Sequence, residues 1–535
     1  MNDITFFHCD TLRSFLNLEY QLGVVDCHRL PLRKVLYSLA RKGYLKTVVL
    51  QRGVETKESQ HEATLYGAGT SVVDRLHFFA TAFDSVNDLK VENNQYGGYC
   101  DLRLNTRSIV SSKITSAVII RPRAETYAYL SCAMEYASKL AVANKVIELP
   151  PITTFPCAEK DQRAVMCAQA ALMGLVEYWN ERSPGMFKNT TAIEINRTAG
   201  VCDSDVLSVS GGRGLYPAEI YTFFKAEGVN ALPLVYNTSI PKNRCRQDIY
   251  GFIESGFPVM ACIEFNSGAH ALLCVGHTYD RNSWSAMADL GYFQEMGSGA
   301  GNYLANTTWI RNFIVHDDNF GPFYFMPLNK MEELLLVGFV VLPDASIQMR
   351  PTDAADAAFA VLTSSQVQKE IDLVLQKRAI LDINYMWLIA FVKHLKVQCG
   401  DGLVLRPVVL PGHKVVELHN GHEFRPIVEK IVEGKEDKYF WYIELTWPDI
   451  YCHRQECCGC VVIEAASNTT VLLHIPGMCV FWDQNVIQIV VAHIEDSPRR
   501  HFREQQPCLN TVVNASVMNG GPAASTKKSG AKKKN

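Results

Sequence analysis

The stretch from about Asp161 to Leu342 has helical runs first and strand-like runs afterwards, and this order limits the fold more than any other feature of the chain. The helical runs are CAQAALMGLVEYW, TAIEINRTAG and LYPAEIYTFFKAEG. Apolar residues then alternate with polar ones, which is typical of strands. Helices separated from strands along the chain indicate an α+β fold, with a helical lobe packed on an antiparallel sheet.

The whole chain has 535 residues, several times the length of a usual domain, so we expect about three domains with separate cores. The first, residues 1–150, is an N-terminal α+β accessory domain. It has a helical run, LPLRKVLYSLARKGYL, two strand-like runs, KTVVLQR and TSAVIIRP, and a helix-patterned end, ETYAYLSCAMEYASKLAV. Pro150, Pro151 and Pro156 follow. Because prolines at this density interrupt helices and sheet ladders, we place a domain boundary there.

Two further domains and a tail are expected after this boundary. Residues 151–345 form the central domain. Residues 346–508 form a C-terminal α+β accessory domain, in which the helical run AADAAFAVLTSSQVQKEIDLVLQKRAILDINYMWLIAFVKHL precedes the strand candidates KYFWYIELTW, GCVVIEAA and NVIQIVVAHI. Residues 509–535 contain few apolar side chains and end in KKSGAKKKN. We expect them to be a disordered, Lys-rich tail.

Charge and apolar patterning exclude several classes of partner and setting. The formal net charge is −3, whereas nucleic-acid-binding proteins carry a clustered basic excess, so no nucleic-acid partner is expected. No apolar run reaches the ~18 to 20 residues that span a bilayer, and MNDITFFHCD lacks the basic start and apolar core of an export signal. The 17 cysteines lack the spacing of a disulfide framework, which indicates free thiols in a reducing, cytoplasmic setting.

Cys167 lies at the amino end of the first helical run of the central domain and is the candidate nucleophile. The partial positive charge at a helix N-terminus and a neighbouring imidazole both lower the pKa of a thiol, and the thiolate is the reactive form. The backbone amide of Cys167 and the side-chain amide of Gln162, five positions upstream, would hold the oxyanion that forms when a carbonyl is attacked.

His270 is the candidate base. The run ACIEFNSGAHALLCVGHTYD alternates as two antiparallel strands joined by a turn at residues 266–268, which places His270 near the start of the second strand. A base must be held rigidly within hydrogen-bond reach of its nucleophile, and a strand end provides this. The orienting carboxylate would come from the run VHDDNFGPF. Asp317 is the first choice and Asp318 the alternative, because strand alternation does not decide between them.

These segments, in this order, resemble the papain-like cysteine peptidases of the bacteriocin-processing type, which cleave double-glycine leaders. The resemblance covers roughly residues 150–342, about a third of the chain. In that family the helix begins with the nucleophilic cysteine, which matches Cys167. The histidine before an apolar strand matches His270, an aspartate in a short turn matches Asp317, and a glutamine of the oxyanion hole matches Gln162.

The resemblance implies a papain-like central domain and a peptide or protein substrate. It implies cleavage of a peptide or isopeptide bond through a Cys-His-Asp triad and an acyl-enzyme, with no metal or other cofactor. The chain departs from the family pattern at Ala168, where the family has Gly, and in the insertion MADLGYFQEMGSGAGNYLANTTW between His270 and Asp317. Two alternatives therefore stand: a catalytically inactive papain-like scaffold that binds a peptide or protein, and an acyltransferase of the transglutaminase type.

The run YCHRQECCGC gathers side chains of the kind that zinc prefers. They are Cys452, His453, Cys457, Cys458 and Cys460. Adjacent cysteines in a single cluster do not give the paired two-residue loops of a zinc ribbon, and the second half of the run continues into the strand candidate GCVVIEAA. The pattern therefore favours structural thiols over a metal site.

Overall fold

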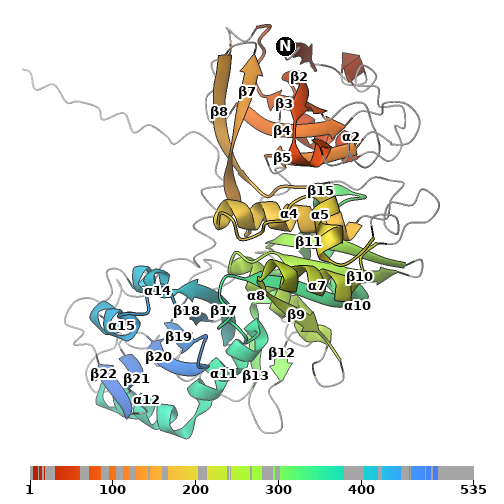
Figure 1. Cartoon of the computed structure of the whole chain (residues 1–535). Helices are drawn as coiled ribbons and strands as arrows, with labels where there is room; N and C mark the ends of the chain where they lie inside the picture. The colour runs from red at the N-terminus through yellow and green to blue at the C-terminus, as the bar shows by residue number, and fades with distance from the viewer. Residues whose placement is uncertain are drawn as a thin grey trace, which may run out of the picture.

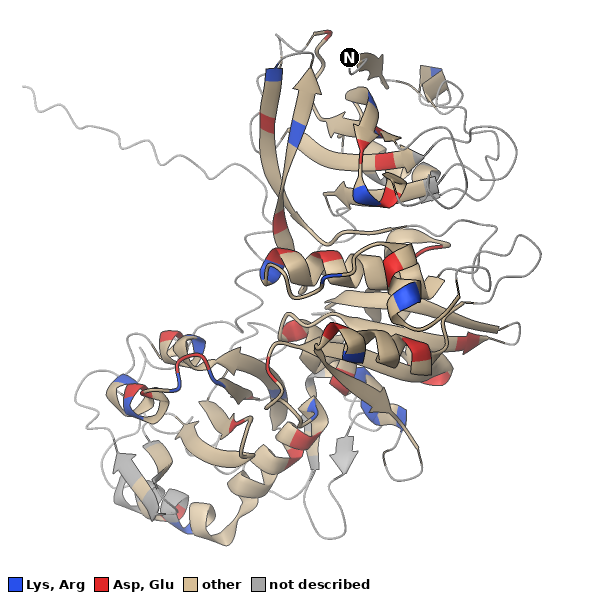
Figure 2. Ribbon diagram, in the orientation of Figure 1, with Lys and Arg blue, Asp and Glu red and all other residues tan. Residues whose placement is uncertain are grey.

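The computed structural model shows an N-terminal, a central and a C-terminal part in chain order (Figure 1). It describes residues 4–9, 11, 13–14, 17–18, 31–41, 43–60, 72–85, 89, 95–103, 113–120, 128–142, 145–158, 167–202, 214–237, 240, 242–265, 268–279, 293–295, 302–378, 403–419, 424–446, 457, 459–475, 478–483 and 486–491. Basic and acidic residues are interspersed along the ribbon (Figure 2), in accord with the small net charge. Among the helices within these ranges, none combines the length and apolarity needed to cross a membrane.

The N-terminal part is built on a five-stranded antiparallel sheet. Its strands, in spatial order, are β1 (Ile4–His8), β2 (Thr47–Glu55), β3 (Val72–Phe79), β4 (Tyr96–Arg103) and β5 (Lys113–Ile119). One helix, α2 (Pro31–Arg41), buries the apolar positions 32, 35, 36 and 39, which recur at helical spacing and form one face. The predicted helix and both predicted strands of this region are therefore confirmed.

The helix predicted at ETYAYLSCAMEYASKLAV is wrong. The described residues there form β6 (Ala128–Tyr129) and β7 (Met134–Val142), and β7 pairs with β8 (Lys145–Thr154). Every second side chain of β7 is buried, namely Tyr136, Ser138 and Leu140. The Ala, Glu and Lys residues of the segment favour a helix locally, but pairing with a neighbouring strand overrides that preference.

The prolines at residues 150 and 151 lie inside β8 and do not end the strand. The register between β7 and β8 shifts at this point, because Tyr136 pairs with Ile152 whereas Ser138 pairs with Leu149. A bulge of this kind accommodates residues that have no backbone N–H to donate to the ladder. The expected interruption is therefore a local irregularity in a continuing ribbon.

The central part is an antiparallel sheet with helices packed on it, so the α+β prediction is confirmed for it. The sheet order is β15 (Gly321–Pro327), β14 (Asn312–Asp317), β11 (Gly268–Thr278), β10 (Val259–Phe265), β16 (Leu335–Leu342) and β9 (Asn230–Val235), and β6 pairs with β11. The helices are α4 (Cys167–Arg182), α5 (Ala192–Thr198), α7 (Pro217–Glu227), α8 (Cys245–Glu254) and α10 (Leu328–Leu334).

Helix α4 lies between the central sheet and the N-terminal part (Figure 1). It contacts β11 and β14 on one side and β7 on another, so its side chains are buried almost all round, including the polar Gln169. Gly174 permits this close approach, because a Cβ there would lie 3.1 Å from the carbonyl oxygen of Pro156 and 3.3 Å from Leu273. The amino end of α4 is thereby held against the strands that carry His270 and Asp317.

The C-terminal part is an eight-stranded sheet covered by helices on both faces. Its order is β12 (Phe293–Glu295), β13 (Asn302–Ala305), β17 (Val404–Pro411), β18 (Tyr439–Thr446), β19 (Gly459–Glu464), β20 (Thr469–Ile475), β21 (Met478–Asp483) and β22 (Val486–Val491). The helices are α11 (Pro351–Thr363), α12 (Ser365–Arg378), α14 (Gly412–Leu418) and α15 (Arg425–Val432). The strand candidates at KYFWYIELTW, GCVVIEAA and NVIQIVVAHI are confirmed.

The insertion between His270 and Asp317 contributes strands to this C-terminal sheet. Strand β13 pairs in parallel with β17, with Leu304 opposite Val404 and Ala305 opposite Leu405. The described part of the insertion therefore joins the central and C-terminal parts through backbone hydrogen bonds.

A buried charge cluster also joins the three parts. Arg406 in β17 donates to Glu444 in β18 at 2.5 Å and to Glu254 at the end of α8. Glu254 also accepts from His277 in β11 at 2.9 Å and from Ser131, which follows β6, at 2.5 Å. Burial alone would raise the pKa of Glu254, but the charges of His277 and Arg406 hold it below its usual range. Glu254 is therefore charged and depends on these partners.

Candidate active site

The fold brings together three side chains that are far apart in the sequence. Cys167 begins α4, His270 lies near the start of β11, and Asp317 ends β14. Strands β11 and β14 are neighbours in the central sheet, and α4 packs on both. The amino end of one helix therefore meets two adjacent strands at a single point.

His270 is hydrogen-bonded to Asp317 and lies close to Cys167. Its Nε2 lies 3.1 Å from Oδ2 of Asp317, and Cys167 is near enough to the ring to help raise its pKa. Because Nε2 faces the carboxylate, Nδ1 is the nitrogen that remains for the thiol. Thiol, imidazole and carboxylate are thus neighbours, as a nucleophile, its base and an orienting group must be.

Both candidate carboxylates lie beside His270, but they are held differently. Oδ1 of Asp317 accepts from the backbone amides of Asn319 at 2.7 Å and Phe320 at 3.0 Å, which fixes this carboxylate while its other oxygen faces the ring. Oδ1 of Asp318 lies 3.4 Å from Nε2 of His270. Asp317 therefore makes the shorter contact from an anchored side chain, and Asp318 adds a second negative charge.

The pKa values of the pair move in opposite directions. Burial alone would lower the pKa of His270, but hydrogen bonds to Asp317 and Cys167 and the charges of both aspartates raise it to about 10. Burial alone would raise the pKa of Asp317, but His270 and the two backbone amides lower it overall. At neutral pH the pair is therefore an imidazolium and a carboxylate.

This raised pKa predicts how stability depends on pH. Between the ordinary value of 6.5 and about 10, the folded chain holds a proton on His270 that the unfolded chain has lost. The stabilisation is complete below pH 6.5 and disappears as the pH rises through about 10. We expect the free energy of unfolding of the wild type to fall across this window, and the fall to be smaller in His270→Gln. Urea titrations at several pH values measure the free energy of unfolding. If it falls equally with pH in the wild type and in His270→Gln, the raised pKa of His270 is contradicted.

A small hollow, with room for about one water molecule, lies beside the cysteine. It is lined in part by Cys157, Cys167, Ala171, Ala271, His316 and Asp318. Cys167 is 6% exposed, so its side chain borders this space and is not enclosed by hydrocarbon alone. The hollow gives the thiol an open side opposite the packed helix.

His316, next to Asp317 in the sequence, is a further lining residue, and it is buried, not a strand-end histidine near solvent. Its Nδ1 donates to the carbonyl oxygen of Pro156 at 3.2 Å, and its Nε2 is buried without a hydrogen-bond partner among the described residues. Burial lowers the pKa of His316 to about 3, so the ring is neutral. It presents an uncharged acceptor nitrogen close to the reacting groups. Its place next to Asp317 in the sequence was the only signal that could have indicated it.

The same residues offer a possible set of metal ligands. His270, Asp317 and Asp318 each provide one nitrogen or oxygen atom, and these atoms lie within 4.8 Å of one another. Two carboxylates and an imidazole suit a divalent cation. A metal-bound Nε2 would have to be unprotonated, however, whereas here the pKa of His270 is raised by the carboxylates that it faces.

Gln162, the expected oxyanion donor, lies outside the described residues, and so do residues 266 and 267 of the turn before His270. The described residues make an α+β protein in which a cysteine lies beside a hydrogen-bonded histidine and aspartate. No protein-family model, curated protein or solved structure matches the chain.

Proposed function

We propose that the chain is a cysteine hydrolase with a papain-like central domain, which cleaves a peptide or isopeptide bond. The observation that supports this function best is the placing of Cys167 beside a His270 that is hydrogen-bonded to Asp317. A helix that begins with the cysteine and packs on an antiparallel sheet carrying the other two groups is the arrangement that the resemblance implied. The small hollow that Cys167 lines leaves one side of the thiol unpacked, and a substrate would have to widen it to reach the sulfur.

In the proposed reaction, His270 holds the proton of the Cys167 thiol, and the thiolate attacks the substrate carbonyl carbon. The backbone amide of Cys167 and the side chain of Gln162 donate to the resulting oxyanion. The imidazolium then gives its proton to the leaving amine, the C–N bond breaks, and an acyl-enzyme remains on Cys167. His270 next takes a proton from water, whose oxygen attacks the thioester and releases the acid. Asp317 keeps the ring in its productive tautomer throughout.

The two aspartates provide a matched pair of variants. Asp317→Asn replaces the anchored carboxylate with an amide and favours the wrong tautomer of His270, so we expect kcat to fall about 10³- to 10⁴-fold. Asp318→Asn leaves the hydrogen bond between His270 and Asp317 in place, so kcat should fall less than about tenfold in this variant. Steady-state kinetics of both variants measure this, and a larger loss in Asp318→Asn would exchange the two assignments.

The test of the proposed function is digestion of a mixed library of peptides and isopeptide-linked peptides, read by mass spectrometry. We expect product from the wild type, none from Cys167→Ala, and an acyl adduct on Cys167 after rapid acid quenching. Cleavage that persists in Cys167→Ala would contradict the proposal. Cleavage without an acyl adduct would favour metal-assisted hydrolysis at His270, Asp317 and Asp318.

The same assay separates the two alternative functions. An inactive scaffold would retain peptides equally well with and without the thiol and would cleave none. An acyltransferase would form a new amide when a primary amine is added in excess, because the amine competes with water for the acyl-enzyme. If the product is still the free acid when excess amine is present, the reaction is hydrolysis. If the product is the new amide, the reaction is acyl transfer.

A further inference from the structure

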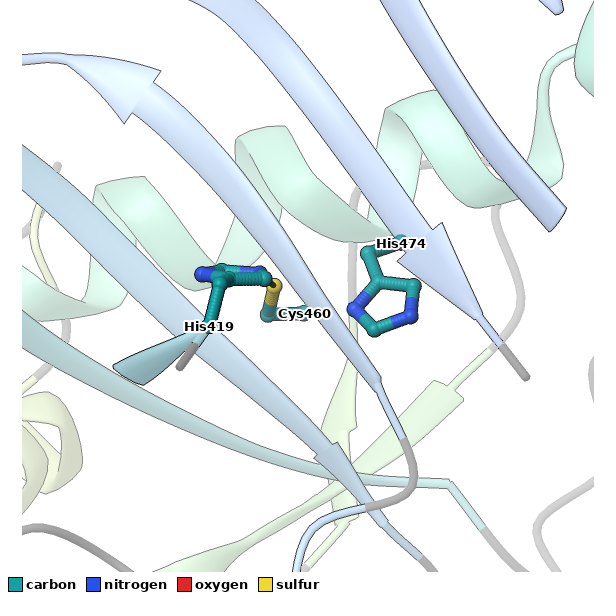
Figure 3. A group of neighbouring side chains, drawn as sticks. All are labelled: His419, Cys460 and His474. Atoms are coloured by element: carbon teal, nitrogen blue, oxygen red, sulfur yellow. Dashed lines mark hydrogen bonds between the residues drawn. The ribbon is translucent and has the colours of Figure 1, made fainter. Parts of the chain in front are cut away.

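A second cluster of reactive side chains lies in the C-terminal part, remote in sequence from the candidate active site. His419 directly follows α14, Cys460 lies in β19 and His474 in β20. Each offers one ligand atom, and the three atoms lie within 4.8 Å of one another. Figure 3 shows the sulfur of Cys460 between the two imidazole rings.

The sheet register places these side chains in the interior. Cys460 is the direct cross-strand partner of His474, so both side chains lie on the same face of the sheet. Helices α14 and α15 cover that face with the buried residues Val415 and Val428. Cys460 and His419 are each 1% exposed and His474 is 6% exposed. Three polar groups that commonly bind metals are thus gathered inside an otherwise apolar layer.

The tautomer of His419 points to a ligand. Its Nδ1 lies 2.8 Å from the carbonyl oxygen of Val415, and a carbonyl only accepts, so Nδ1 carries the proton. The lone pair is then on Nε2, which lies 3.9 Å from the sulfur of Cys460. Metal-bound histidines are held in this way, because a hydrogen bond from the outer nitrogen fixes the ring and directs the other nitrogen at the ion.

We propose that His419, Cys460 and His474 bind one Zn²⁺ ion as a structural site. One thiolate and two imidazoles are a donor set that Zn²⁺ prefers. On binding, the Cys460 thiol releases its proton to solvent and the sulfur bonds to the ion. Cys479, opposite His474 in the sheet, lies outside the group of atoms within 4.8 Å, and a shift of its side chain would bring a second thiol to the fourth position. The burial of the cluster indicates that the ion holds α14 onto β19 and β20.

Of the described residues of the cysteine-rich run, Cys457 and Cys460, Cys460 alone belongs to this set, whereas Cys452, His453 and Cys458 lie outside the described residues. The two histidines come from outside the run, after a helix and from the next strand. Ligand spacing within the run therefore does not indicate the site, and only folding assembles it. The proposal is independent of the hydrolase function, since the cluster shares no residue with Cys167, His270 and Asp317.

The test uses the full chain carrying Cys167→Ala, so that the candidate active site has no thiolate for a metal. Purified without chelators, this protein should contain about one zinc per chain by elemental analysis. After exchange for Co²⁺, it should show thiolate-to-cobalt charge transfer in the near-ultraviolet and the visible bands of a tetrahedral ion. The intensity of the charge-transfer band is proportional to the number of thiolate ligands. It corresponds to one thiolate if Cys460 binds alone and to two if Cys479 binds as well.

Cys460→Ser should remove one thiolate from the charge-transfer band, which then disappears if Cys460 is the sole thiolate ligand and falls to about half if Cys479 is the second. It should also weaken zinc binding by at least about 100-fold, more than the loss of an outer hydrogen bond does. Cys100→Ser, which removes an equally buried thiol from β4, should leave both the band and zinc binding unchanged. If Cys460→Ser does not fold, His474→Gln takes its place and should lose the tetrahedral bands. Absence of thiolate-bound Co²⁺ in the parent protein, or a charge-transfer band that Cys460→Ser leaves at full intensity, would overturn the proposal.

Discussion

Cys167→Ala is expected to lower kcat/KM by at least about 10⁴-fold, because no other group can form the acyl-enzyme. The same change should abolish labelling at this position by an iodoacetamide probe. Circular dichroism and the urea midpoint should stay close to those of the wild type, because alanine fits the first position of α4. Kinetics and peptide mapping of the labelled chain measure the effect.

Cys262 in β10 is the matched control. Its thiol is buried close to Cys167, and burial raises its pKa to about 12, so it should not react at neutral pH. Cys262→Ala is therefore expected to keep both the activity and the label. Activity that persists in Cys167→Ala, or that is lost in Cys262→Ala instead, would show that Cys167 is not the nucleophile.

Arg406→Ala is expected to have the largest effect on stability. The guanidinium is buried and pairs with both Glu254 and Glu444. Its removal takes the guanidinium away from both carboxylates and leaves Glu254 with His277 as its charged partner. Breaking a buried pair in this way costs about 3 to 5 kcal/mol. The free energy of unfolding, measured by urea titration, should fall by that amount, and the loss should be accompanied by weaker association of the C-terminal part with α8.

Arg425→Ala tests whether the loss of any paired arginine lowers the free energy of unfolding as much as Arg406→Ala does. Arg425 forms an ion pair with Glu429 one turn along α15, at 2.7 Å, and both side chains are nearly half exposed. Exposed pairs at this spacing contribute about 0.3 to 0.5 kcal/mol, so little change is expected. Equal losses in the two variants would contradict the role assigned to the buried cluster.

Local patterns predicted the helices and strands whose partners are close in the sequence. The hairpin of β10 and β11 and the helix α4 follow from period-two and period-3.6 spacing. The segment at β7 was misjudged because its Ala, Glu and Lys residues favour a helix, while its pairing with β8 favours a strand. The parallel pairing of β13 with β17 joins positions such as Leu304 and Val404, and no local pattern encodes a contact so remote.

The candidate site shows the same division. The start of a helix and the start of a strand identified Cys167 and His270 from sequence. Alternation could not separate Asp317 from Asp318, and the fold explains why. Both lie where β14 ends, next to a shift in its register with β15, and there both carboxylates reach the ring. The cluster of His419, Cys460 and His474 could not be predicted from the sequence, because the pairing register of β19 and β20 brings its members together.

Bridging of Cys167 to His270 by a short bifunctional alkylating reagent such as 1,3-dibromoacetone tests directly whether the sulfur and the imidazole ring lie side by side. The sulfur displaces the first bromide, and the ring nitrogen displaces the second only if it lies within reach of a three-carbon bridge. In the wild type we expect a cross-linked peptide that joins the start of α4 to β11, and in His270→Gln we expect a single adduct on Cys167. A wild-type protein that gives only the single adduct, or that bridges Cys167 to another residue, would contradict this arrangement.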